Sequence, residues 1–198
     1  MTEPAIRSRR PLEMAILLGT GVLILVADQV SKAIVVANVA VGQRVDVVAD
    51  LLQIWHAQNS GAAFSLFQNG MPLFVVISVL ALVLVAYFAR SLSGRSPWFF
   101  LILGLVLGGT LGNFTDRIAH QGVVTDFISF GFGEVRFATF NVADSSLVVG
   151  ILLIIGTLWL SDRPDPARQG DGVAERASGE AHAAPSHSGD GPAAGAAG

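Results

Sequence analysis

The chain has 198 residues, of which 52% are hydrophobic and 14% are charged, and its mean hydropathy is +0.61. Such a composition exposes more apolar surface than a water-soluble domain buries, so we interpret the chain as an integral membrane protein. The net charge of −3 is spread along the sequence without a basic stripe, which argues against a nucleic-acid partner. The lack of cysteine excludes disulfides, thiolate metal ligands and a cysteine nucleophile.

Four apolar segments are long enough, or nearly so, to cross the roughly 30 Å hydrocarbon core of a bilayer as helices of about 20 residues. They run over about 12–37, 71–89, 98–114 and 142–160. Backbone groups in lipid must be satisfied internally, and these segments lack the alternation of a barrel strand, so we predict helices. In the third segment, Gly104, Gly108 and Gly112 recur at every fourth position, which indicates close helix packing.

A cleavable signal peptide is the alternative interpretation of the N-terminus. Arginines precede the first apolar segment, and Ala37-Asn-Val-Ala40 weakly fits a cleavage site. However, Asp28 and Lys32 interrupt the apolar run before that site, and cleavage would remove both. We therefore expect the first helix to stay attached.

Arginines gather at one end of the predicted helices. By the positive-inside rule, this places both termini and the loop after the second helix in the cytoplasm. The residues concerned are Arg7, Arg9, Arg10, Arg90, Arg95, Arg163, Arg168 and Arg176. The other basic residues, which then lie toward the outer face together with the unusual acids, are Lys32, Arg44, Arg117 and Arg136.

The two predicted outer segments, 41–70 and 117–141, contain short strand patterns. Residues 43–50 and 52–58 partly alternate polar with apolar side chains, and 123–135 is a glycine-punctuated apolar stretch. We therefore predict an all-α membrane protein with four transmembrane helices and a small extracytoplasmic β-sheet or cradle. The expected organisation is a cytoplasmic N-terminus (1–11), a membrane domain (12–160) and a disordered cytoplasmic tail (161–198), whose composition lacks periodicity.

Five acids in or beside the apolar segments are the strongest functional signal, with Asp50 the least secure. A charge near the bilayer centre costs about 2.5–3.5 kcal/mol on insertion scales, so an acid at such a place is a functional-site hypothesis. The five are Asp28, Asp50, Asp116, Asp126 and Asp144.

Some of these acids have a structural explanation. Asp28 and Lys32 stand at i and i+4, which favours an ion pair on one helix face. Asn113 shares a helix face with Asp116 and Arg117, and because an arginine can bind a carboxylate through two hydrogen bonds, the spacing suggests that Asp116 is paired.

Asn141 and Asp144 repeat the three-residue spacing of Asn113 and Asp116. Taken alone, this pair is explained by an N-cap asparagine with an acid in the first turn of a helix. An acid in that position lies at the positive end of the helix dipole, so we predict that Asp144 is a stronger acid than Asp126.

Taken together, the segments resemble the lipoprotein signal peptidases, or type II signal peptidases, a family of bacterial aspartic intramembrane peptidases. The resemblance covers roughly residues 12–160. Its motifs stand in this sequence as Asp28-Gln-Val-Ser-Lys32, Asn59-Ser-Gly-Ala-Ala-Phe-Ser65, Gly108-Gly-Thr-Leu-Gly-Asn-Phe-Thr-Asp-Arg117, Gly122-Val-Val-Thr-Asp-Phe127 and Phe140-Asn-Val-Ala-Asp-Ser145.

The resemblance implies that Asp126 and Asp144 are the catalytic dyad. Residues with a substrate-binding, supporting or structural role would be Asn59, Gly61, Asn113, Arg117, Asn141, Asp28, Lys32 and Asp116. The substrate would be a prolipoprotein whose cysteine carries a diacylglyceryl group, cut just before that cysteine. The resemblance further implies no metal or other cofactor, a monomer in contact with membrane lipid, and a location in the bacterial cytoplasmic (inner) membrane.

The chemistry implied for the dyad follows from two close carboxyls that cannot readily both ionise. One accepts a proton from water while its protonated partner polarises the scissile carbonyl. The segment from Asn59 to Phe67 is expected to form part of a clamp over the substrate.

Two other classes of function fit parts of the pattern. An ion-coupled transporter would use the acids as a proton relay, but transporters place their sites near the midplane between repeated halves. A metal hydrolase would bind Mg²⁺ or Ca²⁺ through the carboxylates and would lose activity on chelation.

Overall fold

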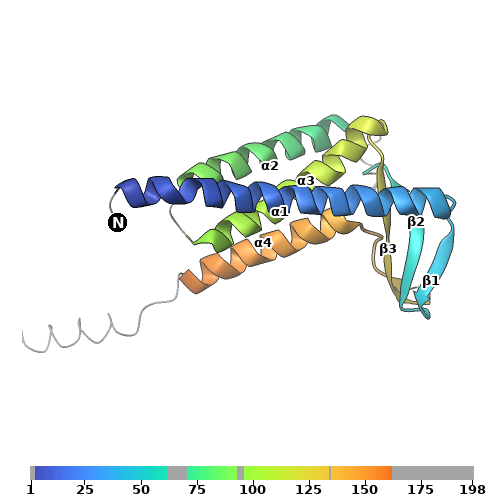
Figure 1. Cartoon of the computed structure of the whole chain (residues 1–198). Coiled ribbons are helices and arrows are strands. Elements are labelled where there is room, and N and C mark those ends of the chain that lie inside the picture. Colours follow the sequence, from blue (N-terminus) through green and yellow to red (C-terminus); the bar gives the residue numbers. More distant parts are fainter. Residues whose placement is uncertain (1–2, 62–70, 93–95, 134, 162–198) are drawn as a thin grey trace, which may run out of the picture. The chain divides into compact units, whose positions relative to one another are not determined.

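The computed structural model describes residues 3–61, 71–92, 96–133 and 135–161. The chain divides into two units, Met1–Thr157 and Leu158–Gly198, and the candidate site lies in the first. Four helices and four strands follow one another along the described residues (Figure 1). They are α1 (Glu3–Asn38), β1 (Arg44–Val48), β2 (Leu52–Asn59), α2 (Met71–Ser91), α3 (Pro97–Ala119), β3 (Val124–Phe132), β4 (Val135–Arg136) and α4 (Val142–Ser161).

All four helices are long and apolar enough to cross a membrane, which confirms the predicted all-α membrane fold with a small sheet. The candidate spans are Arg10–Asn38, Pro72–Ser91, Pro97–Ala119 and Val142–Trp159. Most of their large apolar side chains, such as Leu23 and Val76, are exposed and face what would be lipid. The predicted disordered tail lies, from residue 162 on, outside the described residues.

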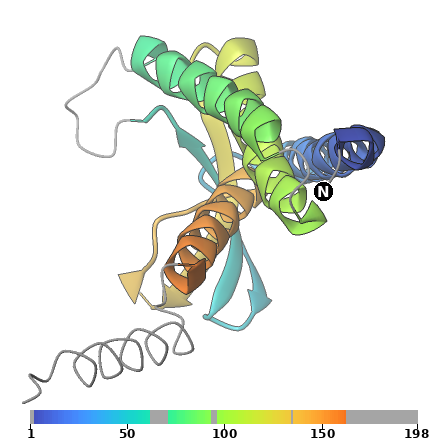
Figure 2. The ribbon, with the colours of Figure 1, turned by 90° about the vertical axis from the view of Figure 1, so that its left-hand side faces the viewer.

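Helix α3 is the centre of the bundle. Half of its span is buried inside the protein, against 11–17% of the other three spans, and Figure 2 shows it among α1, α2 and α4. The glycine stripe explains how α1 comes so close, because a Cβ added at Gly108 would lie 2.6 Å from the Cβ of Ile24. The predicted end of this helix, at residue 114, is five residues short of the observed end at Ala119, since Asn113 and Asp116 point into the protein rather than breaking the helix.

The four strands form one antiparallel sheet in the order β1-β2-β3-β4. It crosses the end of the bundle where α1 finishes (Figure 1). Phe127 of β3 packs against Val35 of α1 and against Val39, the residue that follows this helix, which fixes the sheet to the helices. The strands predicted for both outer segments are therefore present, and β3 carries Asp126 to the helix ends.

Candidate active site

Two acids from different elements, Asp126 on β3 and Asp144 on α4, share contacts with one asparagine. Asn141 donates from Nδ2 to Oδ1 of Asp126 at 2.7 Å. The backbone N–H of Asp144 donates to Oδ1 of Asn141 at 2.9 Å, and the backbone N–H of Asn141 donates back to Oδ2 of Asp144 at 3.2 Å. Because Asn141 is fully buried, this one residue fixes the two carboxylates relative to each other.

The contacts between Asn141 and Asp144 also begin α4. The helix starts at Val142, so Asn141 is its N-cap and Asp144 its third residue. Their reciprocal hydrogen bonds form a capping box. The helix cap expected from the sequence is therefore present, and it holds the Asp144 carboxylate at the positive end of the helix dipole.

Pairing of β2 with β3 brings a second asparagine to Asp126. Ala57 lies opposite Asp126 and Asn59 lies opposite Val124, and Asn59 donates from Nδ2 to Oδ2 of Asp126 at 2.9 Å. The Asp126 side chain is almost completely buried. Burial raises the pKa of Asp126 to about 6 and the nearby charge of Asp144 adds to the rise, while the hydrogen bonds from Asn59 and Asn141 oppose it.

A third asparagine, Asn113 of α3, also contacts Asp144 and Asn141 through the site's hydrogen bonds. It donates from Nδ2 to Oδ1 of Asp144 at 2.7 Å, and its Oδ1 accepts hydrogen bonds from Asn141 at 3.1 Å and from Lys32 at 3.2 Å. Each of the four carboxylate oxygens of Asp126 and Asp144 thus accepts an N–H from an uncharged amide.

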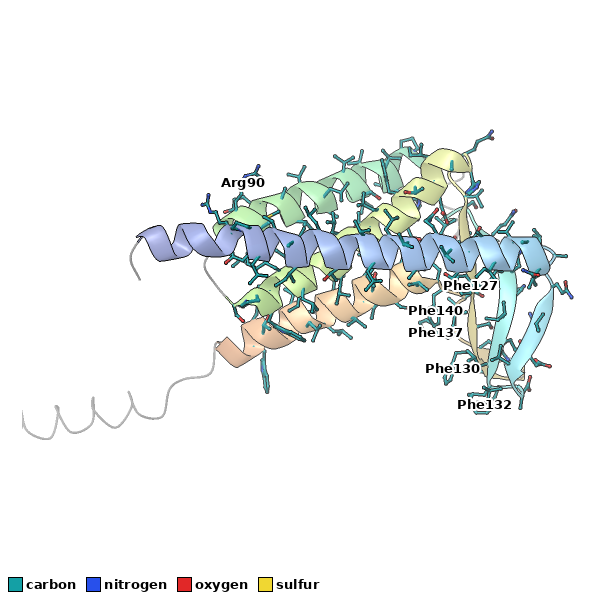
Figure 3. All side chains as sticks on the ribbon, in the orientation of Figure 1. Arg90, Phe127, Phe130, Phe132, Phe137 and Phe140 are labelled. Atoms are coloured by element: carbon teal, nitrogen blue, oxygen red, sulfur yellow. The ribbon has the colours of Figure 1, made fainter. Side chains whose placement is uncertain are left out.

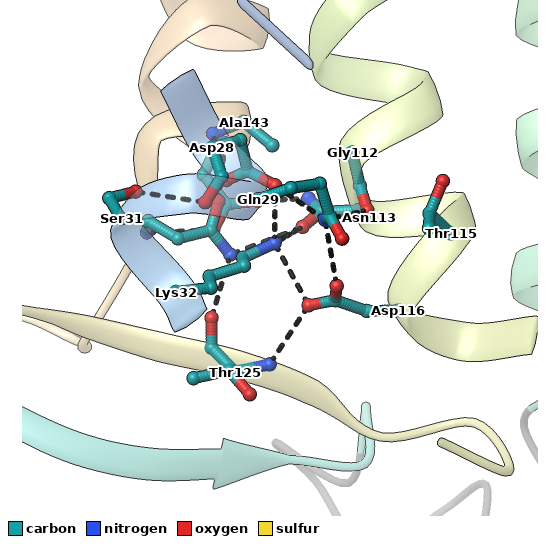
Figure 4. Close-up of polar contacts among 12 residues, drawn as sticks. Asp28, Gln29, Ser31, Lys32, Gly112, Asn113, Thr115, Asp116, Thr125 and Ala143 are labelled. Carbon is teal, nitrogen blue, oxygen red and sulfur yellow. Dashed lines mark hydrogen bonds and ion pairs between the residues drawn. The ribbon is translucent and has the colours of Figure 1, made fainter. Parts of the chain in front are cut away.

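Behind these asparagines lies a buried group of charged and polar side chains, which we call the support cluster: Asp28, Gln29, Lys32 and Asp116. Lys32 Nζ lies 2.7 Å from Oδ2 of Asp28 and 2.9 Å from Oδ2 of Asp116 (Figure 4). Gln29 donates to Oδ1 of Asp116 at 2.9 Å. The ion pair expected from the spacing of Asp28 and Lys32 is therefore present, and one ammonium serves two carboxylates.

The support cluster also holds the backbone beside both site acids. Asp28 Oδ1 accepts the backbone N–H of Ala143 at 2.9 Å, one residue before Asp144. Asp116 Oδ2 accepts the backbone N–H of Thr125 at 3.2 Å, one residue before Asp126. A Cβ at Gly112 would lie 2.6 Å from Asp28 Oδ2, so this close approach requires glycine.

Arg117 lies where α3 faces the start of α2. Its guanidinium stacks over the ring of Phe74 at 4.5 Å, and Nη1 donates to the Asn113 carbonyl at 3.3 Å. Its Nε is buried without a hydrogen-bond partner among the described residues. Asp116 is paired, as the spacing suggests, but its ion-pair partner is Lys32 rather than the neighbouring Arg117, because neighbours on a helix point about 100° apart.

Asn59 also shapes the turn after β2. Its Oδ1 accepts the backbone N–H of Gly61 at 2.8 Å, and Gly61 has a positive φ of 77°, which favours glycine. A side chain there would meet the ring of Phe74. The rest of the expected clamp, from residue 62 to Phe67, lies outside the described residues.

Two further findings differ from the sequence analysis. Asp50 is not buried: it lies in the turn between β1 and β2, where its side chain is 63% exposed near Arg136. Gln29 and Thr125 were not singled out, although both hold Asp116 in place. Gln29 had a usable signal, since it is a polar residue within an apolar helix and stands three positions before Lys32. Among the described residues, no group of three or more His, Cys, Asp or Glu side chains is arranged to hold a metal ion.

Comparison with known protein families gives a match to the family model described as "Signal peptidase (SPase) II" over residues 20–160. A lipoprotein signal peptidase of Listeria monocytogenes is 36% identical over 140 residues, which cover 71% of this chain and 90% of that protein. The lipoprotein signal peptidase of Streptococcus thermophilus is 40% identical over 132 residues, covering 67% and 84%.

Two solved structures share the fold. Both are described as a bacterial membrane enzyme. One has a TM-score of 0.68 and 34% identity, over 74% of this chain and 94% of that one. The other has a TM-score of 0.67 and 31% identity, over 75% of this chain and 92% of that one.

Proposed function

The chain belongs to the signal peptidase II family, the lipoprotein signal peptidases, and we propose that it is an aspartic endopeptidase whose catalytic pair is Asp126 and Asp144. Family membership makes it a multi-pass membrane peptidase that removes signal peptides from lipoproteins. The aspartic mechanism is supported above all by the contacts of Asn141 with both acids. Its side-chain amide donates to the Asp126 carboxylate, and its Oδ1 accepts the backbone N–H of Asp144 in the helix cap.

The electrostatics give the two acids different roles. Burial favours the protonated form of Asp126, whose pKa is raised to about 6, so Asp126 donates a hydrogen bond to the scissile carbonyl. Asp144, held at a helix N-terminus by two N–H donors, is the carboxylate that accepts a proton from the attacking water. The water oxygen then bonds to the carbonyl carbon as Asp126 transfers its proton to the carbonyl oxygen.

Breakdown of the resulting gem-diol reverses these proton transfers. Asp126 takes a proton from a hydroxyl of the gem-diol, while Asp144 gives its proton to the leaving nitrogen as the C–N bond breaks. The products are a carboxylic acid and an amine. The dyad returns to its starting protonation without a covalent intermediate.

The substrate is a prolipoprotein that already carries diacylglyceryl on its cysteine, and cleavage falls just before that cysteine. The bundle offers long lipid-facing helices directly beside the acids, so a cysteine anchored in the bilayer by acyl chains meets the dyad at the helix ends. Arg90 lies at the opposite end, which favours cytoplasmic termini and a site toward the outer face. We propose that the enzyme acts as a monomer.

The decisive experiment uses purified enzyme with a diacylglyceryl-modified prolipoprotein and its unlipidated counterpart, with and without EDTA. The proposal predicts rapid cleavage before the lipidated cysteine, much slower cleavage of the unlipidated chain, and no effect of EDTA. Loss of activity with EDTA and recovery with a divalent cation would favour a metal hydrolase instead.

A further inference from the structure

A cavity of about 600 Å³ opens between α1, α2 and α3 at the end of the bundle away from the sheet. Its walls are apolar and include Leu17 of α1, Val85 of α2 and Leu107 of α3. The cavity lies within three membrane spans, so an apolar chain is the occupant that these walls favour.

The rim of this cavity is basic. Arg10 of α1 and Arg90 of α2 both line it, and both side chains are exposed. Figure 3 shows Arg90 at the end of α2 far from the sheet. Glu13 also lines the cavity, and its side chain is only 2% exposed. Arg10 and Glu13 each have an interaction of their own. The three charged residues of the lining sum to +1, and Arg90 is the exposed cation on which the binding of an anion mainly depends.

Exposed aromatic side chains mark the headgroup level near the same end. Tyr87 lies one turn from Arg90, and Trp98 stands at the start of α3. Amphipathic aromatic residues gather at the membrane–water interface, where arginines also extend their guanidinium groups. Arg10 and Arg90 are thus at the depth of lipid phosphates.

The depth of the cavity distinguishes a lipid from a membrane-spanning peptide. The lining runs along α1 from Arg10 to Leu18, about 12 Å at 1.5 Å per residue. One leaflet contributes about 15 Å of hydrocarbon, whereas a helix that crosses the bilayer needs about 30 Å. The cavity therefore fits an acyl chain of a single leaflet.

We propose that this cavity is a binding site for an anionic phospholipid of the membrane. Its phosphate lies at Arg90, and one acyl chain extends past Val85 and Leu17 toward Leu107. In the orientation proposed above, the lipid comes from the cytoplasmic leaflet, whose surface is anionic. Because the lipid contacts three helices, it stabilises the end of the bundle opposite the acids.

The test uses the full-length protein in detergent, with phosphatidylglycerol and phosphatidylcholine of identical acyl chains. Native mass spectrometry measures lipid retention, and thermal unfolding measures stabilisation. We expect the anionic lipid to be retained about fivefold better, since one basic residue near a membrane surface contributes about that factor. Arg90→Gln should remove most of this preference, whereas Arg44→Gln, a matched charge loss on the sheet, should keep it.

A second variant tests the acyl-chain part independently. Ala86 lines the cavity and is exposed, so Ala86→Phe should fill the opening and reduce retention of both lipids. Leu84→Phe, on the opposite face of α2, is the control and should bind like the wild type. The thermal midpoint without lipid verifies that each variant is folded.

Three results would overturn the proposal. These are equal retention of both lipids by the wild type, unchanged retention by folded Ala86→Phe, and equally tight binding of glycerol phosphate, which lacks acyl chains and would identify a site for a soluble anion.

Discussion

The support cluster and the candidate dyad use the same acid in opposite surroundings. Asp28 and Asp116 share the ammonium of Lys32, at 2.7 and 2.9 Å. Among the described residues, Asp126 and Asp144 accept their hydrogen bonds from uncharged N–H groups of three asparagines. An ammonium in direct contact compensates the charge of a carboxylate, whereas amides fix its position, and the charge of Lys32 acts on Asp126 only from a distance. The first arrangement is suited to holding structure, and the second to keeping a proton available.

Neutralising either acid of the dyad should have the largest effect on activity. Asp126→Asn or Asp144→Asn keeps the side-chain shape but removes one proton-transfer group, so turnover of a lipidated substrate should fall about 10²- to 10⁴-fold. Asp50→Asn, at an exposed acid in the turn between β1 and β2, is the matched control and should retain activity. Substantial turnover by either folded dyad variant would exclude the proposed pair.

Removing the shared cation should instead lower the free energy of unfolding. Lys32→Met leaves two buried carboxylates without their ammonium, and breaking a buried ion pair costs about 3–5 kcal/mol. Denaturant unfolding in detergent should show this loss, while Arg44→Gln, at an exposed cation, should change stability by less than about 1 kcal/mol. A stable Lys32→Met protein would mean that the cluster does not hold the fold.

The raised pKa of Asp126 predicts a pH dependence. Since Asp126 acts in its protonated form, kcat/KM should fall as the pH rises through about 6. Asn59→Ala removes a hydrogen bond that lowers this pKa, so the alkaline limb should move to higher pH. Gln53→Ala, on the same strand but away from the dyad, should leave the limb in place. A shift of the limb to lower pH in Asn59→Ala would contradict the account.

The same shift affects stability. Protonation of Asp126 stabilises the folded state fully below the ordinary aspartate pKa of 3.8, and this contribution is lost as the pH rises through about 6. Between about pH 4 and 6, Asp126→Asn should therefore show a flatter dependence of unfolding free energy on pH than the wild type. Identical slopes would show that Asp126 does not titrate in this range.

The smallest effect is expected far from both groups of acids. Deletion of residues 168–198 removes a polar segment without hydrophobic periodicity, so turnover and thermal midpoint should stay close to those of the full chain. A large fall in turnover by a truncated protein that inserts normally would show that this segment contributes to activity.

Patterns within single segments allowed most of the fold to be predicted. Hydropathy identified the helices, alternation identified the strands, and the spacing of Asn141 and Asp144 predicted a cap that is present. Contacts between segments were harder, because the spacing along one helix does not reveal a partner on another. For that reason the sequence predicts that Asp116 is paired but does not identify its partner, since Lys32 comes from α1 and Asp116 from α3.

The site itself was located by resemblance rather than by pattern. Taken alone, Asn141 and Asp144 indicate only a helix cap, and nothing in the local sequence brings Asp126 to them. The position of Asp126 beside them depends on the register of β2 and β3. It also depends on Asp116 of α3, which accepts the backbone N–H of Thr125. The exposure of Asp50 likewise depends on its place in the turn between β1 and β2.

The most direct test of the central claim is a site-resolved infrared titration of the resting enzyme. If Asp126 and Asp144 share a proton that resides mainly on Asp126, a protonated carboxyl band should disappear as the pH rises through about 6. That band should be missing in Asp126→Asn and remain in Asp50→Asn. A band that persists in Asp126→Asn and vanishes in Asp144→Asn would contradict the assignment of the proton, and the lack of any protonated carboxyl below pH 6 would contradict the proton-sharing pair itself.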